Sequence, residues 1–237
     1  MREIQRQFTL CDDLILPSRA EREEALYFLD ELRETGFSPI GTDEAGRGAL
    51  AGPVIAAAVY LTVEQENKLL SMGLKDSKRV TYLGREKIFK AMNDMGVLWC
   101  ADSGGIERID RDNILNASLW AMGQSVTRLD EIMEEMEISP SCVIVDGIER
   151  IPDINIPQWV LVGADNLIPS VSAASIIAKV IRDRIMINAD GKYPDYNFEK
   201  NKGYPTAYHI DILKKLGMTD IHRRTFCRKI LHGKEQE

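Results

Sequence analysis

Two acidic residues stand side by side at the end of a predicted strand, directly before a glycine-rich turn. They are Asp43 and Glu44, followed by Gly46, Arg47 and Gly48. Successive strand residues point to opposite faces, so the two acids cannot both face the core, and adjacent anions repel unless a metal ion or a function offsets the repulsion. Glycines allow a ligand to approach the backbone, and the arginine fork suits phosphate. The pattern indicates metal-dependent chemistry on a phosphate ester; a polar turn between two strands is the alternative.

Two further acids follow predicted strands. Asp146 ends the apolar run Val143-Ile-Val145, and Asp165 lies between a predicted strand and a predicted helix. In open α/β sheets, ligands bind at the carboxyl ends of the strands. The alternatives are an Asp-Gly turn at Asp146 and a loop or cap residue at Asp165. The glycines of residues 46–52 are spaced one residue too widely for a dinucleotide fingerprint and precede a strand, which argues against such a site.

An aromatic residue lies among basic residues near the C-terminus. Tyr204 follows Asn201-Lys202-Gly203, and Arg223 and Arg224 come later. Such a group can stack on a nucleotide and contact phosphates. Ser77 and Lys78 form a smaller cationic loop that could also hold a phosphate. The alternatives are a tyrosine that anchors its loop, a serine that begins a helix, and a solvated basic helix face.

The charge is unevenly distributed. The net charge of −7 argues by itself against a nucleic-acid binder. Residues 196–237, however, carry nine basic and five acidic side chains, a net of +4, so the rest of the chain carries −11. This distribution is compatible with a polyanion held over a carboxylate-rich site. The run Arg182-Asp183-Arg184 is interpreted as a surface charge cluster or salt bridge.

The composition is that of a globular protein without a membrane span. The 237 residues are 44% hydrophobic and 28% charged, and no apolar run is long enough to cross a bilayer. The N-terminus does not resemble a secretory signal. Four scattered cysteines, Cys11, Cys100, Cys142 and Cys227, argue against a zinc site or disulfide framework. We therefore expect a cytoplasmic protein.

Apolar periodicity predicts an α/β fold with a mixed sheet, because three close strands precede strands that alternate with helices. Strands are predicted at residues 38–42, 53–61, 97–101, 142–145 and 159–162, and helices at 19–35, 63–72, 82–95, 112–136, 171–188, 206–216 and 225–231. We expect an N-terminal helical extension at 1–37, a catalytic domain at 38–193 and a C-terminal helical appendage at 194–237.

Ordered motifs over residues 38–228 resemble bacterial type 2 ribonuclease H, the ribonuclease HII family. The motifs are Asp43-Glu44-Ala-Gly-Arg-Gly-Ala-Leu-Ala-Gly-Pro53, Asp76-Ser77-Lys78, Asn113-Ile114-Leu115, Val145-Asp146-Gly147, Ala174-Ser175-Ile176 to Asp183, Asn201-Lys-Gly-Tyr204 and His222-Arg223. The related type HIII enzymes lack the arginine of the first motif and have Glu in place of the fourth Asp, whereas Arg47 and Asp165 are present here.

The resemblance implies a ribonuclease H-like fold and a two-metal phosphodiesterase that uses Mg²⁺ or Mn²⁺. It assigns metal binding and catalysis to Asp43, Glu44, Asp146 and Asp165. It implies that Gly46, Arg47 and Gly48 sense the ribose 2′-hydroxyl and that Tyr204 senses the junction. We expect Ser77, Lys78, Arg223 and Arg224 to contact the substrate as well, and the protein to act as a monomer without a membrane partner.

The expected function is an endoribonuclease that cuts the RNA strand of RNA–DNA hybrids and the 5′ side of single ribonucleotides in duplex DNA. Its products would carry a 3′-hydroxyl and a 5′-phosphate, and it would support ribonucleotide removal from DNA. One alternative is a metal-dependent DNA nuclease or resolvase of the same fold, which would also cut an all-DNA duplex. Another is a non-catalytic hybrid-binding protein.

Overall fold

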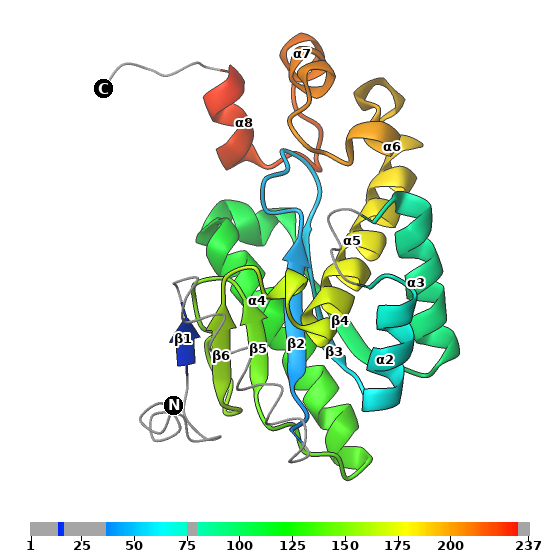
Figure 1. The fold of residues 1–237 in the computed structure, drawn as a ribbon. Helices are drawn as coiled ribbons and strands as arrows, with labels where there is room; N and C mark the ends of the chain where they lie inside the picture. The colour runs from blue at the N-terminus through cyan, green and yellow to red at the C-terminus, as the bar shows by residue number, and fades with distance from the viewer. Residues whose placement is uncertain (1–13, 17–36, 75–79, 232–237) are drawn as a thin grey trace.

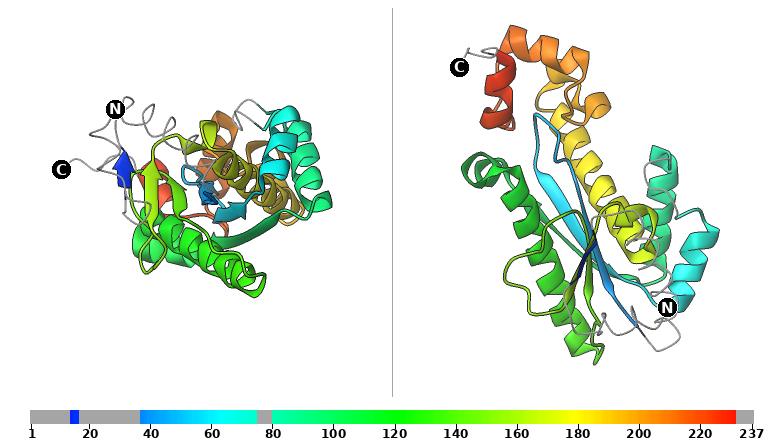
Figure 2. Two further views of the ribbon diagram at one scale, coloured as in Figure 1. Left: turned by 60° about the horizontal axis from the view of Figure 1, so that its bottom comes forward. Right: turned by 60° about the vertical axis from the view of Figure 1, so that its left-hand side comes forward.

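The computed structural model describes residues 14–16, 37–74 and 80–231, which form a sheet with helices on both faces (Figures 1 and 2). In the described part of the chain the sheet has six strands in the order β1-β6-β5-β2-β3-β4. The strands are β1 (Leu14–Leu16), β2 (Ile40–Ala45), β3 (Val54–Tyr60), β4 (Leu98–Gly104), β5 (Val143–Asp146) and β6 (Gln158–Leu161). The predicted mixed sheet is confirmed.

The central strand β2 joins an antiparallel half of the sheet to a parallel half. It pairs with β3 in antiparallel register, with Asp43 opposite Ala57, and β4 extends this half. On its other side β2 pairs in parallel with β5, with Thr42 opposite Val145, and β6 and β1 follow in parallel. Because parallel strands end at the same edge, the carboxyl ends of β2, β5 and β6 lie together.

Helices bury one apolar cluster on each face of the sheet. On one face α5 (Pro169–Asp190) packs against β2 and β3, with α2 (Val63–Ser71) and α3 (Tyr82–Asp94) beside it. On the other face α4 (Ile106–Glu135) covers β3 and β4 (Figure 2). A Cβ on Gly41 would lie 2.3 Å from the backbone nitrogen of Val171, so the absence of a side chain there lets α5 approach β2 closely.

The predicted helix at 112–136 begins earlier than expected. In the structure α4 starts at Ile106, and Asn113 interrupts its helical backbone with φ of 68°. The Asn113 side chain accepts a hydrogen bond from the backbone N–H of Asn116 at 3.0 Å, in the manner of a helix cap. The sequence signal therefore located the second part of α4 and missed its first turns.

The C-terminal segment, here residues 194–231, is helical as predicted and lies beyond the carboxyl end of β2 (Figure 1). Its elements are η3 (Pro194–Tyr196), α6 (Phe198–Asn201), α7 (Ala207–Leu216) and α8 (Arg224–Leu231). Backbone hydrogen bonds tie it to the β2–β3 connection: Gly203 accepts from Leu50 at 2.8 Å, and Leu50 accepts from Arg223 at 2.8 Å. The segment is thus joined to the body through the turn between two central strands.

Some predictions concern residues outside the described part. The helix at 19–35 and the loop residues Ser77 and Lys78 lie there. Strand β1 was not predicted, and it falls within the residues assigned to the N-terminal extension. Among the described residues, no helix combines the length and the apolar character needed to cross a bilayer.

Candidate active site

Three aspartates meet where the parallel strands end. Asp43 lies on β2, Asp146 is the last residue of β5, and Asp165 lies in the short 3₁₀ helix η2 (Ala164–Asn166) after β6. Each offers a carboxylate oxygen, and these atoms all lie within 4.8 Å of one another. We call Asp43, Asp146 and Asp165 the carboxylate cluster. Residues far apart in the sequence meet here because the strand register aligns their ends.

Backbone and side-chain amides hold the carboxylates of Asp146 and Asp165 in place. Oδ1 of Asp146 accepts from the N–H groups of Gly163 and Ala164 at 2.7 and 2.9 Å, which fixes the turn that carries Asp165. Asp165 in turn accepts from the side-chain amide of Asn166 at 2.7 Å. The cluster is therefore preorganised by the sheet edge and by its own turn.

The electrostatics of the cluster call for a cation. Burial raises the pKa of Asp43 well above its usual range, and the nearby carboxylates of Glu44 and Asp146 raise it further. Hydrogen bonds from the Ser175 hydroxyl and from the Glu44 backbone oppose this shift. Closely spaced anions shielded from water are costly unless a positive charge joins them. Because all the donor atoms are carboxylate oxygens, the cluster fits a hard divalent ion such as Mg²⁺ or Mn²⁺.

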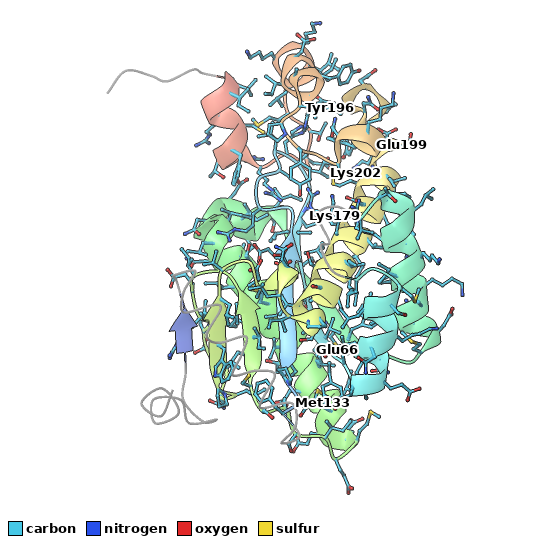
Figure 3. The ribbon with its side chains drawn as sticks, viewed as in Figure 1. Glu66, Met133, Lys179, Tyr196, Glu199 and Lys202 are labelled. Carbon is cyan, nitrogen blue, oxygen red and sulfur yellow. The ribbon has the colours of Figure 1, made fainter. Side chains whose placement is uncertain are left out.

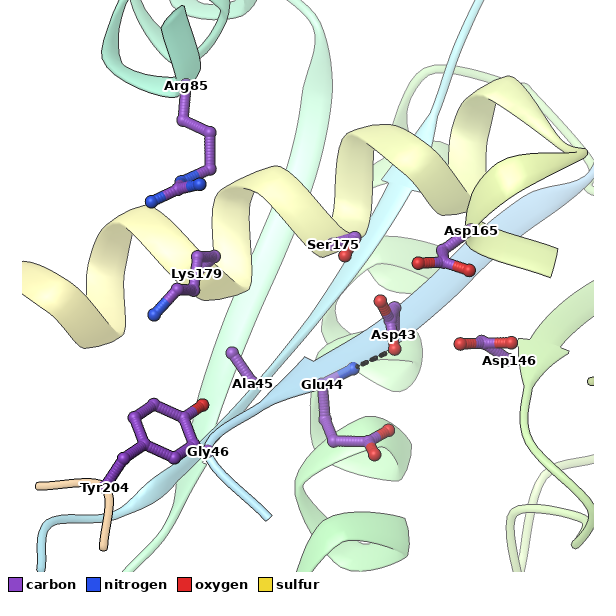
Figure 4. A pocket seen from close by; sticks show the side chains of 10 residues that line it. All are labelled: Asp43, Glu44, Ala45, Gly46, Arg85, Asp146, Asp165, Ser175, Lys179 and Tyr204. Carbon is purple, nitrogen blue, oxygen red and sulfur yellow. Dashed lines mark hydrogen bonds between the residues drawn. The ribbon is translucent and has the colours of Figure 1, made fainter. Parts of the chain in front are cut away.

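Glu44, the fourth predicted acid, lies beside the cluster but outside it. Its carboxylate forms an ion pair with Arg47 at 3.3 Å. Burial raises the pKa of Glu44, although Arg47 lowers it in part. Glu44 nevertheless lines the same pocket as the cluster, a cavity of about 440 Å³ (Figure 4).

The glycine–arginine–glycine turn, residues 46–48, has one buried and two exposed positions. Gly46 has φ of +102°, and a Cβ there would lie 2.0 Å from Nε of Arg182, so this position requires glycine. Arg47 and Gly48 are exposed, and a Cβ on Gly48 would meet nothing within 4 Å. The interior of the protein therefore explains Gly46 but not Gly48, which leaves the backbone at Gly48 open to a ligand.

Two buried arginines attach this turn to the rest of the molecule. The guanidinium of Arg182 donates to the carbonyls of Pro53, Ala51 and Lys202 at 2.9–3.0 Å. That of Arg223 donates to Gly52 at 2.9 Å and to Arg47 at 3.0 Å. Burial lowers the pKa of Arg223 to about 9, and Arg182 lowers it further. We call Arg182 and Arg223 the arginine anchors.

These positions decide between two alternatives from the sequence and correct one prediction. Arg182 and Asp183 are 0% and 2% exposed, so the run Arg182-Asp183-Arg184 is not a surface charge cluster. The salt-bridge alternative is confirmed, because Asp183 pairs with Lys179 and Arg85, and the exposed Arg184 pairs with Glu86. Arg223 is 0% exposed with its guanidinium directed at backbone carbonyls, which differs from the direct substrate contact expected of it. Its neighbour Arg224 is exposed and remains free to meet a polyanion.

Tyr204 lies in the same pocket, at the end away from the carboxylate cluster (Figure 4). The guanidinium of Arg182 lies 5.0 Å from its ring centre. Its backbone carbonyl lies 2.9 Å from Nδ1 of His209, whose Nε2 lies 3.0 Å from Nε2 of His222. Burial lowers the pKa of both imidazoles, that of His222 to about 4, so they stay neutral near pH 7. The loop that carries Tyr204 is therefore held in place by buried, neutral histidines of the C-terminal segment.

Sequence reasoning gave no role to three residues that line the pocket: Arg85, and Ser175 and Lys179, which lie within the motif Ala174-Ser175-Ile176 to Asp183. Ser175 and Lys179 are separated by four positions on α5, as are Lys179 and Asp183, so helical periodicity places all three on one face. That spacing was a usable signal. Arg85 lies on α3 and carried no comparable signal.

Comparison with known proteins places this geometry in a family context. Residues 40–229 match the family model described as Ribonuclease HII. The chain is 40% identical to ribonuclease HII of Caldicellulosiruptor saccharolyticus over 88% of its own length and 97% of that protein. The crystal structure of ribonuclease H2 from Pyrococcus horikoshii OT3 is similar with a TM-score of 0.63 and 26% identity, covering 83% of this chain and 98% of that one. The structure of Bst-RNase HIII in complex with Mn²⁺ is similar in fold, with a TM-score of 0.65 and 21% identity over 76% of this chain and 63% of that one.

Proposed function

The chain belongs to the ribonuclease HII family, a family of metal-dependent endonucleases for RNA–DNA hybrids, and we propose that it also cuts on the 5′ side of single ribonucleotides embedded in duplex DNA. The observation that carries this proposal is the shared pocket. One cavity is lined by the carboxylate cluster, by Gly46 and by Tyr204. A cutting site and two elements suited to reading the sugar therefore face the same ligand.

The carboxylate cluster would hold the metal ions, with Glu44 completing the set. Two divalent ions bound there would lower the pKa of the attacking water and stabilise the departing 3′-oxygen. Asp43 would be the ligand shared between ions, because it lies on the central strand β2 and its carboxylate interacts with those of both Glu44 and Asp146. Hydrolysis in this arrangement leaves a 3′-hydroxyl and a 5′-phosphate.

The glycine–arginine–glycine turn and Tyr204 would select the sugar on each side of the cut. The exposed backbone at Gly48 can bond a ribose 2′-hydroxyl, the group that distinguishes RNA from DNA. The Tyr204 ring would stack on a following sugar that lacks this hydroxyl. Arg182 packs against Gly46 and lies over the Tyr204 ring, so one buried side chain fixes the spacing of both elements.

The direct test compares three duplexes that differ only in their ribonucleotides. We expect the purified protein with Mg²⁺ or Mn²⁺ to cut a continuous RNA–DNA hybrid and a DNA duplex with one ribonucleotide, and to leave an all-DNA duplex intact. Product sizing should place the cut 5′ of the ribonucleotide. Cleavage of the all-DNA duplex would favour a DNA nuclease of the same fold, and binding without turnover would favour a hybrid-binding protein.

A further inference from the structure

The end of the pocket that holds Tyr204 also carries two positive side chains to which the proposed function assigns no role. Arg85 of α3 and Lys179 of α5 line it beside Tyr204, opposite the carboxylate cluster (Figure 4). Figure 3 labels Lys179 on α5 below the C-terminal helices, with Lys202 just above it. The pocket is therefore anionic at one end and cationic at the other.

One buried carboxylate orients both cations. Asp183 is 2% exposed, and its Oδ1 lies 2.6 Å from Nζ of Lys179 while its Oδ2 lies 3.5 Å from a terminal nitrogen of Arg85. Arg85 also donates to the carbonyl of Val80 at 2.7 Å. A single negative charge is thus shared between two positive ones, and the group keeps a net positive charge.

The group also retains unused hydrogen-bonding capacity. Nε of Arg85 is buried without a hydrogen-bond partner among the described residues. Lys179 has three N–H donors, and its hydrogen bond to Asp183 uses one of them. Buried donors in native proteins are nearly always satisfied, and leaving one unpaired is costly. The Lys179 side chain is 28% exposed and its Nζ lies 5.3 Å from the centre of the Tyr204 ring, so its ammonium is accessible to a ligand in the pocket.

We propose that Arg85 and Lys179, positioned by Asp183, bind a phosphate of the substrate strand next to the one that is cut. The proposal rests on the proposed function for the position of the cut. The arginine fork and the lysine ammonium converge from two helices, and such charge-assisted donors suit the two free oxygens of a phosphodiester. Asp183 keeps Arg85 and Lys179 at the end of the pocket away from the carboxylate cluster, so the two cations do not neutralise it.

Substitution of each cation, with a matched control, tests the proposal. Arg85→Gln and Lys179→Gln each remove one charge from the pocket wall. Arg184→Gln removes an ion pair that also joins α5 to α3, through Glu86 at 2.5 Å, but Arg184 does not line the pocket. Fluorescence anisotropy of a labelled RNA–DNA hybrid, in metal-free buffer over a range of salt concentrations, gives Kd and its salt dependence without turnover.

We expect each pocket variant to raise Kd about tenfold, as loss of one charge-assisted contact should. The slope of log Kd against log salt should fall by about 0.7–0.9, the value for one phosphate contact. With metal present, KM should rise much more than kcat falls. Arg184→Gln should change neither Kd nor slope, and Lys179→Arg should restore most of the binding because it keeps the charge.

The opposite result would assign the group a structural role. An unchanged salt slope in both glutamine variants, with a lower Tm, would overturn the proposal. If a glutamine variant does not fold, an unchanged slope in Arg85→Met and Lys179→Met, which also remove the charge, would do the same. The failure of the proposed function is distinguishable, because wild-type protein would then bind the hybrid normally and leave the single ribonucleotide uncut.

Discussion

Two regions of the molecule, the carboxylate cluster and the arginine anchors behind the glycine–arginine–glycine turn, bury opposite charges in opposite ways. The carboxylate cluster gathers anions that repel one another, and burial raises the pKa of Asp43. The arginine anchors are buried cations whose donors meet backbone carbonyls of the β2–β3 connection. The first arrangement is incomplete until a cation joins it, whereas the second is largely satisfied within the protein.

This difference indicates a catalytic role for the carboxylate cluster and a structural role for the arginine anchors. Removing a charge from the carboxylate cluster should abolish catalysis and relieve repulsion. Removing a charge from an arginine anchor should leave buried carbonyls without donors and loosen the turn that carries Gly46. Removal of one charge is thus expected to have opposite effects on stability in the carboxylate cluster and at the arginine anchors.

The largest expected effect is at Asp43. Asp43→Asn keeps the shape of the side chain and loses its charge, so metal binding and several kcal/mol of transition-state stabilisation should be lost. We expect kcat/KM on the single-ribonucleotide duplex to fall by about 100-fold or more. The exposed Asp211→Asn, which breaks an ion pair with Lys215, should leave activity and Tm nearly unchanged.

The pH dependence of the stability of Asp43→Asn tests whether the carboxylate cluster destabilises the fold when no metal is bound. The pKa of Asp43 is raised in the folded state, so the folded protein binds this proton more readily than the unfolded chain, and the group destabilises the fold as pH rises past its unfolded value. In metal-free buffer the variant should therefore melt higher than wild type at pH 7, by about 2–4 °C for each kcal/mol gained, with the gain fading toward pH 3. A lower Tm at pH 7 would contradict this account of the cluster.

The next effect is at the arginine anchors. Arg223→Gln removes hydrogen bonds to the carbonyls of Gly52 and Arg47, so we expect a loss of about 2 kcal/mol or more in the free energy of unfolding. The adjacent Arg224→Gln is the matched control, since its side chain is exposed. Arg224→Gln should change the free energy of unfolding by no more than about 0.5 kcal/mol. It should also weaken hybrid binding in a salt-dependent way. Equal destabilisation by both substitutions would remove the distinction between anchor and contact.

The smallest effect is the most selective. Tyr204→Ala should lower kcat/KM about 10- to 100-fold on a single-ribonucleotide duplex, if stacking contributes roughly 1–3 kcal/mol as it does for bases. The loss should be smaller on a continuous hybrid, which offers no deoxyribose after the cut. Tyr204→Phe, which keeps the ring, should behave like wild type. Equal losses on both substrates together with a lower Tm would mean that Tyr204 only supports its loop.

The carboxylate cluster was predictable because each acid follows a strand with a local signal. The run Val143-Ile-Val145 ends directly at Asp146, and the strand before Asp165 is equally apolar. Parallel strands then bring their ends together without further information. Strand β1 was missed because three residues are too few for a periodic pattern.

The arginine anchors were not predictable, because their partners lie far away in the sequence and are backbone atoms. Arg182 bonds Ala51 across 131 positions, and Arg223 bonds Gly52 across 171. Every residue type has a backbone carbonyl, so the sequence does not show which carbonyls an arginine will meet, and the run Arg182-Asp183-Arg184 was interpreted as a surface charge cluster or salt bridge. The exposed and buried arginines of such a run are the same residue type and differ only in their surroundings in the folded protein.

The contact between Arg223 and Arg47 closes a loop of 176 positions, and this separation sets an order of assembly. Distant contacts must overcome a larger loop-closure entropy than the hairpin of β2 and β3, which pairs Ala45 with Ile55. We therefore expect the hairpin to form early and the C-terminal segment to dock late. Amide hydrogen exchange should show the segment opening as a cooperative unit at lower free energy than the sheet. A molecule in that open form would retain the edge that gathers the aspartates while the turn proposed to read the sugar is released, so docking of the last helices would control the proposed discrimination between sugars.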